Sequence, residues 1–586
     1  MANKFGSTCP FLSLKHKVPE MPFLTRETVQ ERLHKRIEDG VNGFRQNIGL
    51  IGSPGVGKSH LLKNFFQSIS RDSRLLSIFI RGETIDDKQL VEQWLGAVLC
   101  SVLIRKTSDI PSSLSGLIQH TEPLIPSTVQ AVKHVQRLFH QEKKSSAVRE
   151  LFGLSSILAR ETGKKVVLII DELQGLEKLP VTDPFAMLGK QIMPAKEVLY
   201  LVTSSARDRA LEIFRNKLSL LFGNFELLEL GPFGFFEMEK YLAGRMPTHR
   251  WTEPLKRFLF HMTDGEPLYV DLMIQCIEKM GVREIPQPVT PASLIDAFCQ
   301  ELFDDRGRIA LRFEQKIQQC ASLSGKNGVH KRVLISLSQG RRKVIPIAAS
   351  IAETVTETQK VLKRLVQEGL IVKSGSFYHL PDILFRFWIR EVYLKRHALF
   401  LPEGQSLRKS LFDKLNATCD SCARMHNEDV GARVETMLKE FRNDTVEFSQ
   451  KKFQCPQFSE TALRVLPNSL FAILGKGGRG RWLFYVGAET IDERAVENLL
   501  KDSKNLRNIR RKILIALSGI EQNAKLIAQE AKMQIWDLRQ LNVFMDYYDL
   551  PKIIITSQSR THGTEQKTDG SIMGTVAQNV SALNSR

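Results

Sequence analysis

The chain has 586 residues, of which 42% are hydrophobic and 25% are charged. This composition is typical of globular proteins and excludes disorder over most of the length. The 83 Lys and Arg residues outnumber the 64 Asp and Glu residues, and the net charge of +19 favours a polyanionic partner. No apolar run approaches the ~20 residues that span a bilayer, and the first residues lack the apolar core of a signal peptide. Eight cysteines without framework spacing indicate a reducing compartment. We therefore expect a cytoplasmic protein with no membrane partner.

Short apolar runs alternate with helical stretches in the first part of the chain. Continuous apolar runs of this length are typical of parallel strands that are buried on both faces of a sheet. The sequence therefore predicts a doubly wound α/β domain over residues 23–231, preceded by an N-terminal arm over 1–22. The four predicted strands are 47–51, 75–80, 166–170 and 198–202.

Residues 52–59 read GSPGVGKS and fit the phosphate-binding pattern G-x4-G-K-[ST]. A predicted strand precedes the loop and a predicted helix follows it, as the motif requires. Backbone N–H groups of such a loop surround phosphates, while Lys58 reaches the β- and γ-phosphates and the Ser59 hydroxyl binds Mg²⁺. The sequence thus predicts an ATP and Mg²⁺ site that is formed by Gly52, Ser53, Pro54, Gly55, Val56, Gly57, Lys58, Ser59 and His60.

Two acidic residues follow the third predicted strand. Asp171 at a strand end is suited to hold Mg²⁺, and Glu172 is suited to orient or deprotonate a water molecule. Polar residues end the next strand, and Thr203, Ser204 or Ser205 could sense the γ-phosphate or merely cap the strand. We assign Ser204 and Ser205, with Lys58 and Glu172, to catalysis. Candidates for an arginine that acts in trans are Arg207, Arg209 and Arg215.

The remainder of the chain divides into further predicted segments. Residues 232–325 are helical and suit a lid, 401–430 resemble a polar linker, and 557–586 have a disordered composition. Residues 326–400 show three helices followed by a hairpin signal around Ser374-Gly375-Ser376, the order of a winged helix-turn-helix. The residues predicted to contact double-stranded DNA are Arg341, Arg342, Lys343, Thr358, Gln359, Lys360, Lys363, Arg364 and Lys373.

These motifs together resemble the archaeal-type ATPases of the AAA+/STAND group, which are related to the origin-recognition ATPases and are prokaryotic. The resemblance covers about residues 23–400. Its segments are FLTRE at 23–27, LFGNFELLELGPF at 221–233, TDGEP at 263–267 and DILFRFW at 382–388. It implies that Arg26 borders the adenine site, although Thr25 replaces a glycine of the family pattern. It also implies that Pro267, in the lid, contacts the nucleotide.

Residues 431–556 resemble a restriction-endonuclease-like domain of the Mrr type. Glu435 matches the acidic residue of its helix, but the predicted strands at 469–474 and 482–489 do not supply the expected Asp or E-x-K. Because carboxylates must hold Mg²⁺ beside the scissile phosphate, the resemblance implies a module that does not cleave. A basic run at 501–511 forms either a stripe that contacts phosphates or a solvated helix face. Its cations are Lys501, Lys504, Arg507, Arg510 and Arg511.

The sequence leaves the function open between alternatives. The first is an ATPase that binds DNA through the winged helix, with a homo-oligomer possible in its ATP state. The second is a STAND-like signalling or defence switch that acts through unidentified protein partners, and a third is an ATP-dependent restriction nuclease. A zinc site at Cys419, Cys422 and His426 would need distant Cys455 as its fourth ligand and is a remote alternative.

Overall fold

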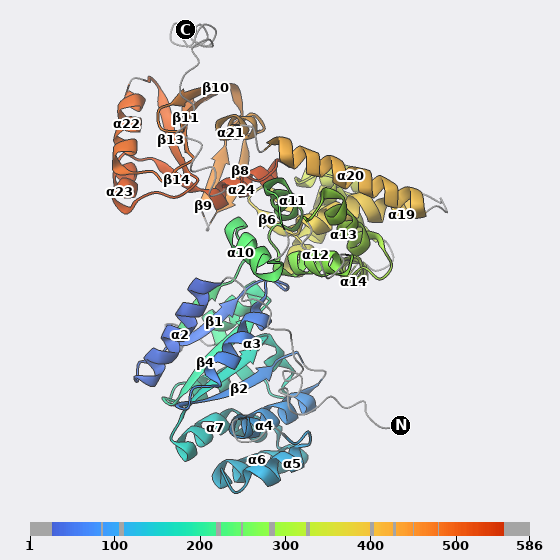
Figure 1. Ribbon diagram of the computed structural model, residues 1–586, viewed down its shortest axis with the longest axis vertical. Coiled ribbons are helices and arrows are strands. Elements are labelled where there is room, and N and C mark those ends of the chain that lie inside the picture. The colour runs from blue at the N-terminus through green and yellow to red at the C-terminus, as the bar shows by residue number, and fades with distance from the viewer. Residues whose placement is uncertain are drawn as a thin grey trace. The chain divides into compact units, whose positions relative to one another are not determined.

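The computed structural model divides the chain into two units, which are described separately (Figure 1). The first contains Met1–His249 with Gly265–Gln275, and the second contains Arg250–Asp264 with Cys276–Arg586. The predicted arm, the predicted tail, residues 23–25 and His426 lie outside the described residues. Among the residues that the structure does describe, no helix is both long and apolar enough to cross a membrane. Those residues are 26–83, 86–104, 110–217, 224–247, 250–280, 288–323, 328–398, 404–425, 429–448, 451–478, 480–504 and 506–555.

A parallel five-stranded sheet forms the centre of the first unit. Its strand order is β2-β3-β4-β1-β5, and every neighbouring pair is parallel. The four strands predicted from apolar runs are confirmed, each within two residues at either end. Every residue of β1 and of β4 is buried, which explains their continuous apolar sequence. The strands are β1 (Asn47–Ile51), β2 (Leu75–Arg81), β3 (Lys165–Asp171), β4 (Val198–Ser204) and β5 (Phe225–Glu229).

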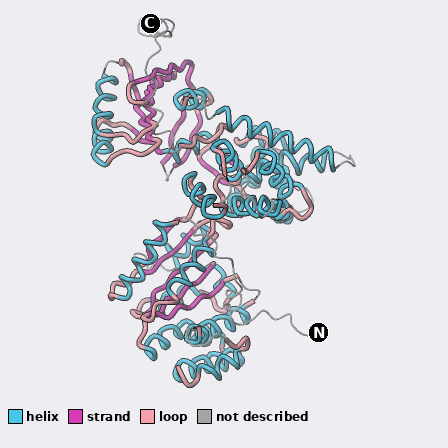
Figure 2. The backbone as a smooth tube through the Cα atoms, in the orientation of Figure 1, coloured by secondary structure: helices cyan, strands magenta, loops and turns pink. Residues whose placement is uncertain are grey.

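Helices connect and cover these strands, as Figure 2 shows in cyan and magenta. Helices α3 and α4 pack against β2, and α7 packs against β3 and β4. Side chains from both layers enter one continuous apolar core. The helices of this unit are α2 (Glu27–Val41), α3 (Lys58–Ile69), α4 (Asp87–Leu103), α5 (Leu114–Thr121), α6 (Pro126–His140), α7 (Lys144–Thr162), α8 (Pro184–Ile192), α9 (Arg207–Glu212), α10 (Phe235–Arg245) and the first part of α12 (Pro267–Met280).

The second unit begins with helices. Residues 404–425, which the sequence analysis assigns to a linker, form the long helix α20 against α11 and α13. Its buried side chains Leu411, Leu415 and Cys419 are spaced by four residues, so a helical stripe was present in a segment that is otherwise polar. The helices are α11 (Glu253–Thr263), α13 (Pro291–Phe303), α14 (Arg308–Ser322), α18 (Ile383–Trp388), α19 (Leu394–Ala398) and α20 (Gly404–Met425).

Three short helices and a hairpin follow α14 in the order that the sequence predicts. Helices α15 (Val329–Ser338), α16 (Val344–Ile351) and α17 (Val355–Gln367) pack against one another. Strands β6 (Val372–Ser374) and β7 (Phe377–His379) form an antiparallel pair. Gly375 at the turn has a φ of 57°, a backbone conformation that favours glycine. We call these residues, 329–379, the three-helix segment.

A C-terminal α/β module completes the second unit. In its five-stranded sheet β10, β11 and β12 are antiparallel neighbours, whereas β12, β13 and β14 are parallel. Alternate β12 side chains enter two different cores, so helices cover both faces (Figure 1). The elements are α21 (Val430–Lys439), β8 (Asp444–Phe448), β9 (Lys451–Cys455), β10 (Phe458–Leu466), β11 (Leu470–Gly477), β12 (Gly480–Gly487), α22 (Glu493–Lys504), β13 (Ile509–Ala516), α23 (Gln522–Glu530), β14 (Gln534–Asp537) and α24 (Leu538–Tyr547).

Candidate functional site

The candidate nucleotide site lies at the carboxyl edge of the parallel sheet. Strand β1 leads into the loop of residues 52–57, β3 ends at Asp171, and β4 ends at Ser204. Because β4 lies between β1 and β3, the three strand ends are adjacent. Residues separated by more than a hundred positions in the chain thus meet at one edge, which is where ligands bind in open α/β sheets.

The phosphate-binding loop connects β1 to α3. Gly55 and Gly57 have φ values of 106° and 92°, in the region that favours glycine. Lys58, the first residue of α3, is only 4% exposed. Its Nζ donates hydrogen bonds to the carbonyl oxygens of Gly52 at 2.7 Å and Ser53 at 3.2 Å. The loop therefore curls around its own ammonium group at a helix N-terminus, a position that favours phosphate.

The acidic residues after β3 are both buried and share one hydroxyl group. Thr203 Oγ1 donates a 2.6 Å hydrogen bond to Asp171 Oδ1 and accepts a 3.0 Å hydrogen bond from the Glu172 backbone N–H. The hydroxyl of Thr203 is therefore bonded to the acidic pair. Of the three residues considered as γ-phosphate sensors, it is the one that orients Asp171.

The Glu172 carboxylate is held by a chain of polar groups. Its Oε2 accepts hydrogen bonds from the Ser205 backbone N–H at 2.8 Å and from Gln174 Nε2 at 2.6 Å. Gln174 Oε1 in turn accepts a 2.7 Å hydrogen bond from Ser204 Oγ. Ser204 and Ser205 thus reach Glu172 through a side chain and a backbone amide, respectively. Gln174 was not predicted from the sequence, where its one available signal is its position two residues after Glu172.

Charges of both signs are buried together at this edge. Lys58 Nζ lies 3.7 Å from Glu172 Oε1. Burial lowers the pKa of Lys58, and the carboxylates of Glu172, Asp171 and Glu266 act in the opposite direction. A buried ammonium group beside carboxylates is suited to exchange these partners for phosphate oxygens.

Arg26, which the resemblance places beside adenine, is engaged in protein contacts. Its guanidinium donates to the carbonyl oxygens of Gly231 and Pro232 and pairs with Glu237 at 3.2 Å. It also lies over the Phe233 ring, 4.9 Å from the centroid. Burial lowers the pKa of Arg26, against the effect of Glu237 and Glu266. Arg26 therefore fixes the turn that follows β5.

The lid residue Pro267 is buried as the first residue of α12. The preceding residue, Glu266, approaches the phosphate-binding loop so closely that a Cβ atom on Gly55 would collide with its carboxylate. His60 lies in the first turn of α3, 3.2 Å from the Asn64 amide nitrogen, and burial lowers its pKa. The structure therefore brings an unpredicted acidic group, Glu266, to the loop.

The three arginines considered for action in trans follow β4. Arg207 pairs with Glu229 at 2.8 Å, and Arg209 pairs with Glu177 and Glu212, each at 2.5 Å. Arg215 is exposed. The charges of Arg207 and Arg209 are therefore balanced by carboxylates on the surface of the first unit.

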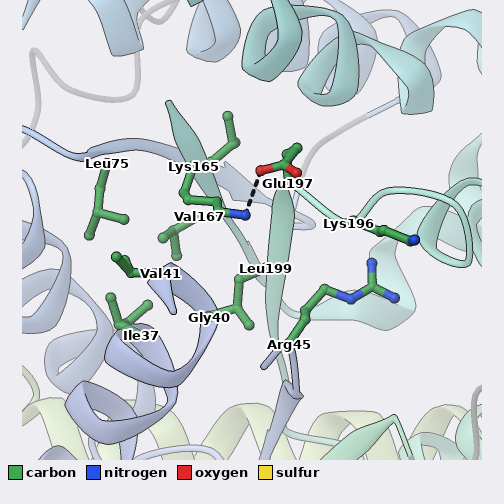
Figure 3. Close-up of a pocket in the computed structure, with 11 residues that line it drawn as sticks. Ile37, Gly40, Val41, Arg45, Leu75, Lys165, Val167, Lys196, Glu197 and Leu199 are labelled. Carbon is green, nitrogen blue, oxygen red and sulfur yellow. Dashed lines mark ion pairs between the residues drawn. The ribbon is translucent and has the colours of Figure 1, made fainter. Parts of the chain in front are cut away.

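A separate small hollow lies at the amino edge of the same sheet (Figure 3). Figure 3 shows it between α2 and the starts of the strands, with a dashed line for the ion pair of Lys165 and Glu197. Lys165 Nζ lies 2.5 Å from Glu197 Oε2. Its other lining groups include the aliphatic side chains of Ile37, Val41 and Leu199. It lies at the opposite edge of the sheet from Lys58.

The residues predicted to contact DNA divide into exposed and buried groups. Thr358 is 0% exposed, and its hydroxyl donates to the Thr354 carbonyl oxygen at 2.8 Å. Arg342 is 5% exposed and donates to the Asp546 carbonyl and the Asp549 carboxylate. Neither side chain reaches solvent, because each is used to pack the second unit. The exposed members are Arg341, Gln359, Lys360, Lys363, Arg364 and Lys373.

The hairpin tip of the three-helix segment docks on β8 of the C-terminal module. The Ser376 backbone N–H donates to the Thr445 carbonyl at 2.8 Å, and the Ser374 hydroxyl donates to the Glu447 carbonyl at 3.0 Å. A Cβ atom on Gly375 would collide with the Thr445 carbonyl. Lys343 pairs with Asp444 at 2.5 Å. The hairpin is thus joined to β8 through serine hydroxyls and one backbone N–H, which bond to backbone groups of β8.

The C-terminal module uses its one matched acidic residue in local contacts. Glu435 Oε1 accepts a 2.7 Å hydrogen bond from Thr461 and lies 3.3 Å from Lys439 Nζ. Within the described residues, no group of three or more His, Cys, Asp or Glu side chains is arranged to hold a metal ion. Cys419 and Cys455 are both buried free thiols.

Comparisons with known proteins agree with the geometry of the first unit. Residues 22–190 match the AAA ATPase domain family, so this part of the chain carries an AAA ATPase domain. No curated protein matches the chain. Similar solved structures are a Walker-type ATPase of Pyrococcus abyssi (16% identity, 63% of this chain and 96% of that one, TM-score 0.44), the Aeropyrum pernix ORC2 protein (14%, 69% and 95%, 0.40) and the Aeropyrum pernix ORC1 protein in complex with DNA (13%, 66% and 98%, 0.36).

Proposed function

We propose that the chain binds and hydrolyses ATP, binds double-stranded DNA, and changes conformation or assembles into a homo-oligomer in response to the nucleotide. The observation that carries the proposal is the burial of Lys58, Asp171 and Glu172 together beside a phosphate-binding loop. The AAA ATPase domain match over residues 22–190 supports the nucleotide as ligand. The net charge of +19 supports a polyanionic partner.

The residues of the site suit Mg²⁺ and ATP. Asp171 and Ser59 would hold Mg²⁺, which neutralises charge on the transferred phosphoryl group. Lys58 would exchange its carbonyl partners for phosphate oxygens. Glu172 would accept a proton from the attacking water as the water oxygen bonds to the γ-phosphorus and the bond to ADP breaks. Gln174 and the Ser205 backbone N–H keep that carboxylate oriented.

We further propose that the three-helix segment is a winged helix that presents α17 to the DNA major groove. The exposed side chains of Gln359, Lys360, Lys363 and Arg364 lie on α17. Lys373 lies in β6, and Arg341 lies between α15 and α16. Because most of these groups are cations, phosphate contacts would dominate affinity and would make it depend on salt.

Substitution of Glu172 by Gln tests the ATPase proposal. The variant keeps the shape of the side chain and loses its base, so hydrolysis should fall by about 100-fold or more while ATP binding persists. Lys58→Ala provides the contrast, because it should lose ATP binding as well. ATP turnover by phosphate release and ATP affinity by calorimetry separate the two. Unchanged turnover in Glu172→Gln would exclude this role for the carboxylate.

The docked hairpin favours a second candidate, a STAND-like switch that acts through protein partners. In this reading the three-helix segment is a spacer, since its tip binds β8 rather than a ligand. Titration of the ATPase rate with duplex DNA discriminates the candidates. A DNA-dependent increase supports the first, and a rate that ignores saturating DNA supports the second.

A further inference from the structure

A wide, solvent-open hollow of about 940 Å³ lies on the C-terminal module. Its walls come from the β8–β9 hairpin, the turn between β11 and β12, and the start of β13. Three lining residues are cations, namely Lys476, Arg510 and Arg511, and no carboxylate lines the hollow among the described residues. Pockets for small molecules are mostly apolar, so this lining suits an anion instead.

The cations converge from separate strands. Lys476 is the second-last residue of β11, and Arg510 and Arg511 follow the first residue of β13. Lys476 and Arg510 are exposed. Lys476 is in register with Arg481 of β12, so two like charges stand opposite each other. Glu460, the β10 register partner of Lys476, does not line the hollow.

One of the two guanidinium groups is already oriented by aromatic contacts. Arg511 lies over the rings of Trp482 at 4.8 Å and Phe453 at 5.5 Å from their centroids. Because Trp482 is only 6% exposed, it offers no free face on which a base could stack. The hollow therefore has charge for phosphates but no surface for reading bases.

The remaining lining is suited to a close approach by a sugar-phosphate backbone. Gln454 and Gln457 bring amide donors from and beside β9, and the turn between β11 and β12 contains Gly477, Gly478 and Gly480. Glycines leave backbone N–H groups accessible to an oxyanion. Amides and cations without carboxylates are the groups that bind phosphodiesters in a sequence-independent manner.

We propose that this hollow binds the phosphodiester backbone of duplex DNA, as a contact separate from the α17 surface. The inference rests on the proposed function in taking DNA as the ligand. It assigns to the C-terminal module a binding role at the β11–β12 turn and the start of β13, where Lys476 and Arg510 lie.

The test uses the full chain with Lys476→Ala and Arg510→Ala combined. The matched control removes one Lys and one Arg that are exposed elsewhere on the module, through Lys525→Ala with Arg494→Ala. Affinity for a fluorescently labelled duplex is measured by anisotropy between about 50 and 200 mM salt. The slope of log K against log salt should lose about two units of its magnitude in the test variant, and affinity at low salt should fall by about tenfold or more. The control should match the parent.

Several outcomes would overturn the inference, and they are distinguishable. If the test variant and the parent both bind DNA and have equal slopes of log K against log salt, the hollow does not bind DNA. The proposed function would stand. A parent that binds no duplex would reject both. The difference in affinity between the test variant and the parent could instead be seen only with single-stranded DNA of the same sequence, or could disappear in millimolar inorganic phosphate. Either result would assign the hollow to a different anion. The midpoint temperature of thermal unfolding is measured for each variant. A value equal to that of the parent shows that a loss of affinity reflects binding and not misfolding.

Discussion

At the scale of the residue, Glu172 illustrates how geometry prepares a side chain for chemistry. Its φ of 60° lies in the left-handed region, which costs a non-glycine residue about 1 kcal/mol or more. Gln174 Nε2 and the Ser205 backbone N–H bond one carboxylate oxygen, and Lys58 lies near the other. Substitution of Gln174 should therefore affect the chemical step more than binding.

We predict that Gln174→Ala lowers the turnover of ATP by about tenfold and changes the ATP affinity by less than about twofold. The physical reason is loss of orientation of the base while the phosphate-binding loop stays intact. Steady-state kinetics checks this through the separate values of kcat and KM. A raised KM with an unchanged kcat would instead assign Gln174 to nucleotide binding.

Glu266 is a second residue whose charge matters. Its carboxylate reaches Gly55 of the phosphate-binding loop and acts on both Arg26 and Lys58. A triphosphate brought to this loop meets a like charge. Removing one such repulsion near a partly solvated site is worth about 1 kcal/mol, or about fivefold in affinity.

We accordingly predict that Glu266→Gln tightens ATP binding by about fivefold. Calorimetric titration with ATP measures the change. Glu27→Gln, which removes one exposed carboxylate of α2, is the control and should leave the affinity at the parental value. Weaker binding by Glu266→Gln would show that the carboxylate supports the loop instead of opposing the phosphates.

At the scale of the element, the β6–β7 hairpin owes its placement to hydrogen bonds between two serine hydroxyls and the β8 backbone. Ser374 and Ser376 exchange hydrogen bonds with β8, and the Phe377 ring stacks on Tyr547 with an interplanar angle of 3°. Gly375 lies against the Thr445 carbonyl with a positive φ. A side chain at position 375 would therefore separate the hairpin from β8.

We predict that Gly375→Ala lowers the free energy of unfolding of the second unit by about 2 kcal/mol or more, because it adds a collision to the cost of a positive φ. Gly369→Ala is a matched control, since Gly369 has a φ of 69° and no atom within 4 Å of an added Cβ. It should cost about 1 kcal/mol. Denaturant unfolding measures both. Equal costs for the two variants would contradict the importance of the docking contact.

At the scale of the whole molecule, a buried charge network joins the parts of the second unit. Asp546 of α24 pairs with Arg386 of α18 at 2.7 Å, and its backbone carbonyl accepts from Arg342 beside α16. Lys552 pairs with Asp264 at the end of α11. The division between the two units falls between Asp264 and Gly265. The network thus ends one residue from the segment that carries Glu266 to the nucleotide loop.

The network predicts a defined pH dependence. Burial alone would raise the pKa of Asp546, but Arg386, Arg342 and Lys552 outweigh it and the pKa is lowered. A carboxyl group whose pKa is lower in the folded state stabilises above its unfolded value of about 4 and loses this contribution as the pH falls through the folded value. Burial lowers the pKa values of His261 and His379 to about 4, so in the unfolded state these histidines bind protons at a higher pH than in the folded state. They therefore reduce stability progressively as the pH falls below about 6.5.

We predict that Asp546→Asn lowers the free energy of unfolding by about 3 kcal/mol at pH 7, because it leaves buried guanidinium groups without their carboxylate. The difference between parent and variant should shrink as the pH falls below about 4. Urea unfolding at a series of pH values measures it, and the two histidines are common to both proteins. A difference that stays constant down to pH 3 would show that Asp546 contributes by packing instead of by charge.

Local sequence patterns were sufficient to predict the phosphate-binding loop, the acidic pair and the strands of the first sheet. The loop of residues 52–59 and the acidic pair of Asp171 and Glu172 were predictable, because a phosphate cradle and a buried strand end each need particular residues at fixed spacing. The strands of the first sheet were predictable because burial on both faces makes them continuously apolar. The buried stripe of α20 was overlooked, although its four-residue spacing lay in the sequence.

Only the tertiary structure decided which of the predicted residues are free to act. In the sequence, Arg342 and Thr358 cannot be distinguished from an exposed arginine and an exposed threonine. In the structure, packing buries both. The contacts of Arg342 with Asp546, of Ser376 with Thr445, and of Glu266 with Gly55 join positions that are far apart in the chain. The periodicity of hydrophobic residues shows which face of a helix or strand is buried, but it does not show which other segment covers that face. Availability for binding therefore depends on which distant segments fold against a residue, which no linear pattern contains.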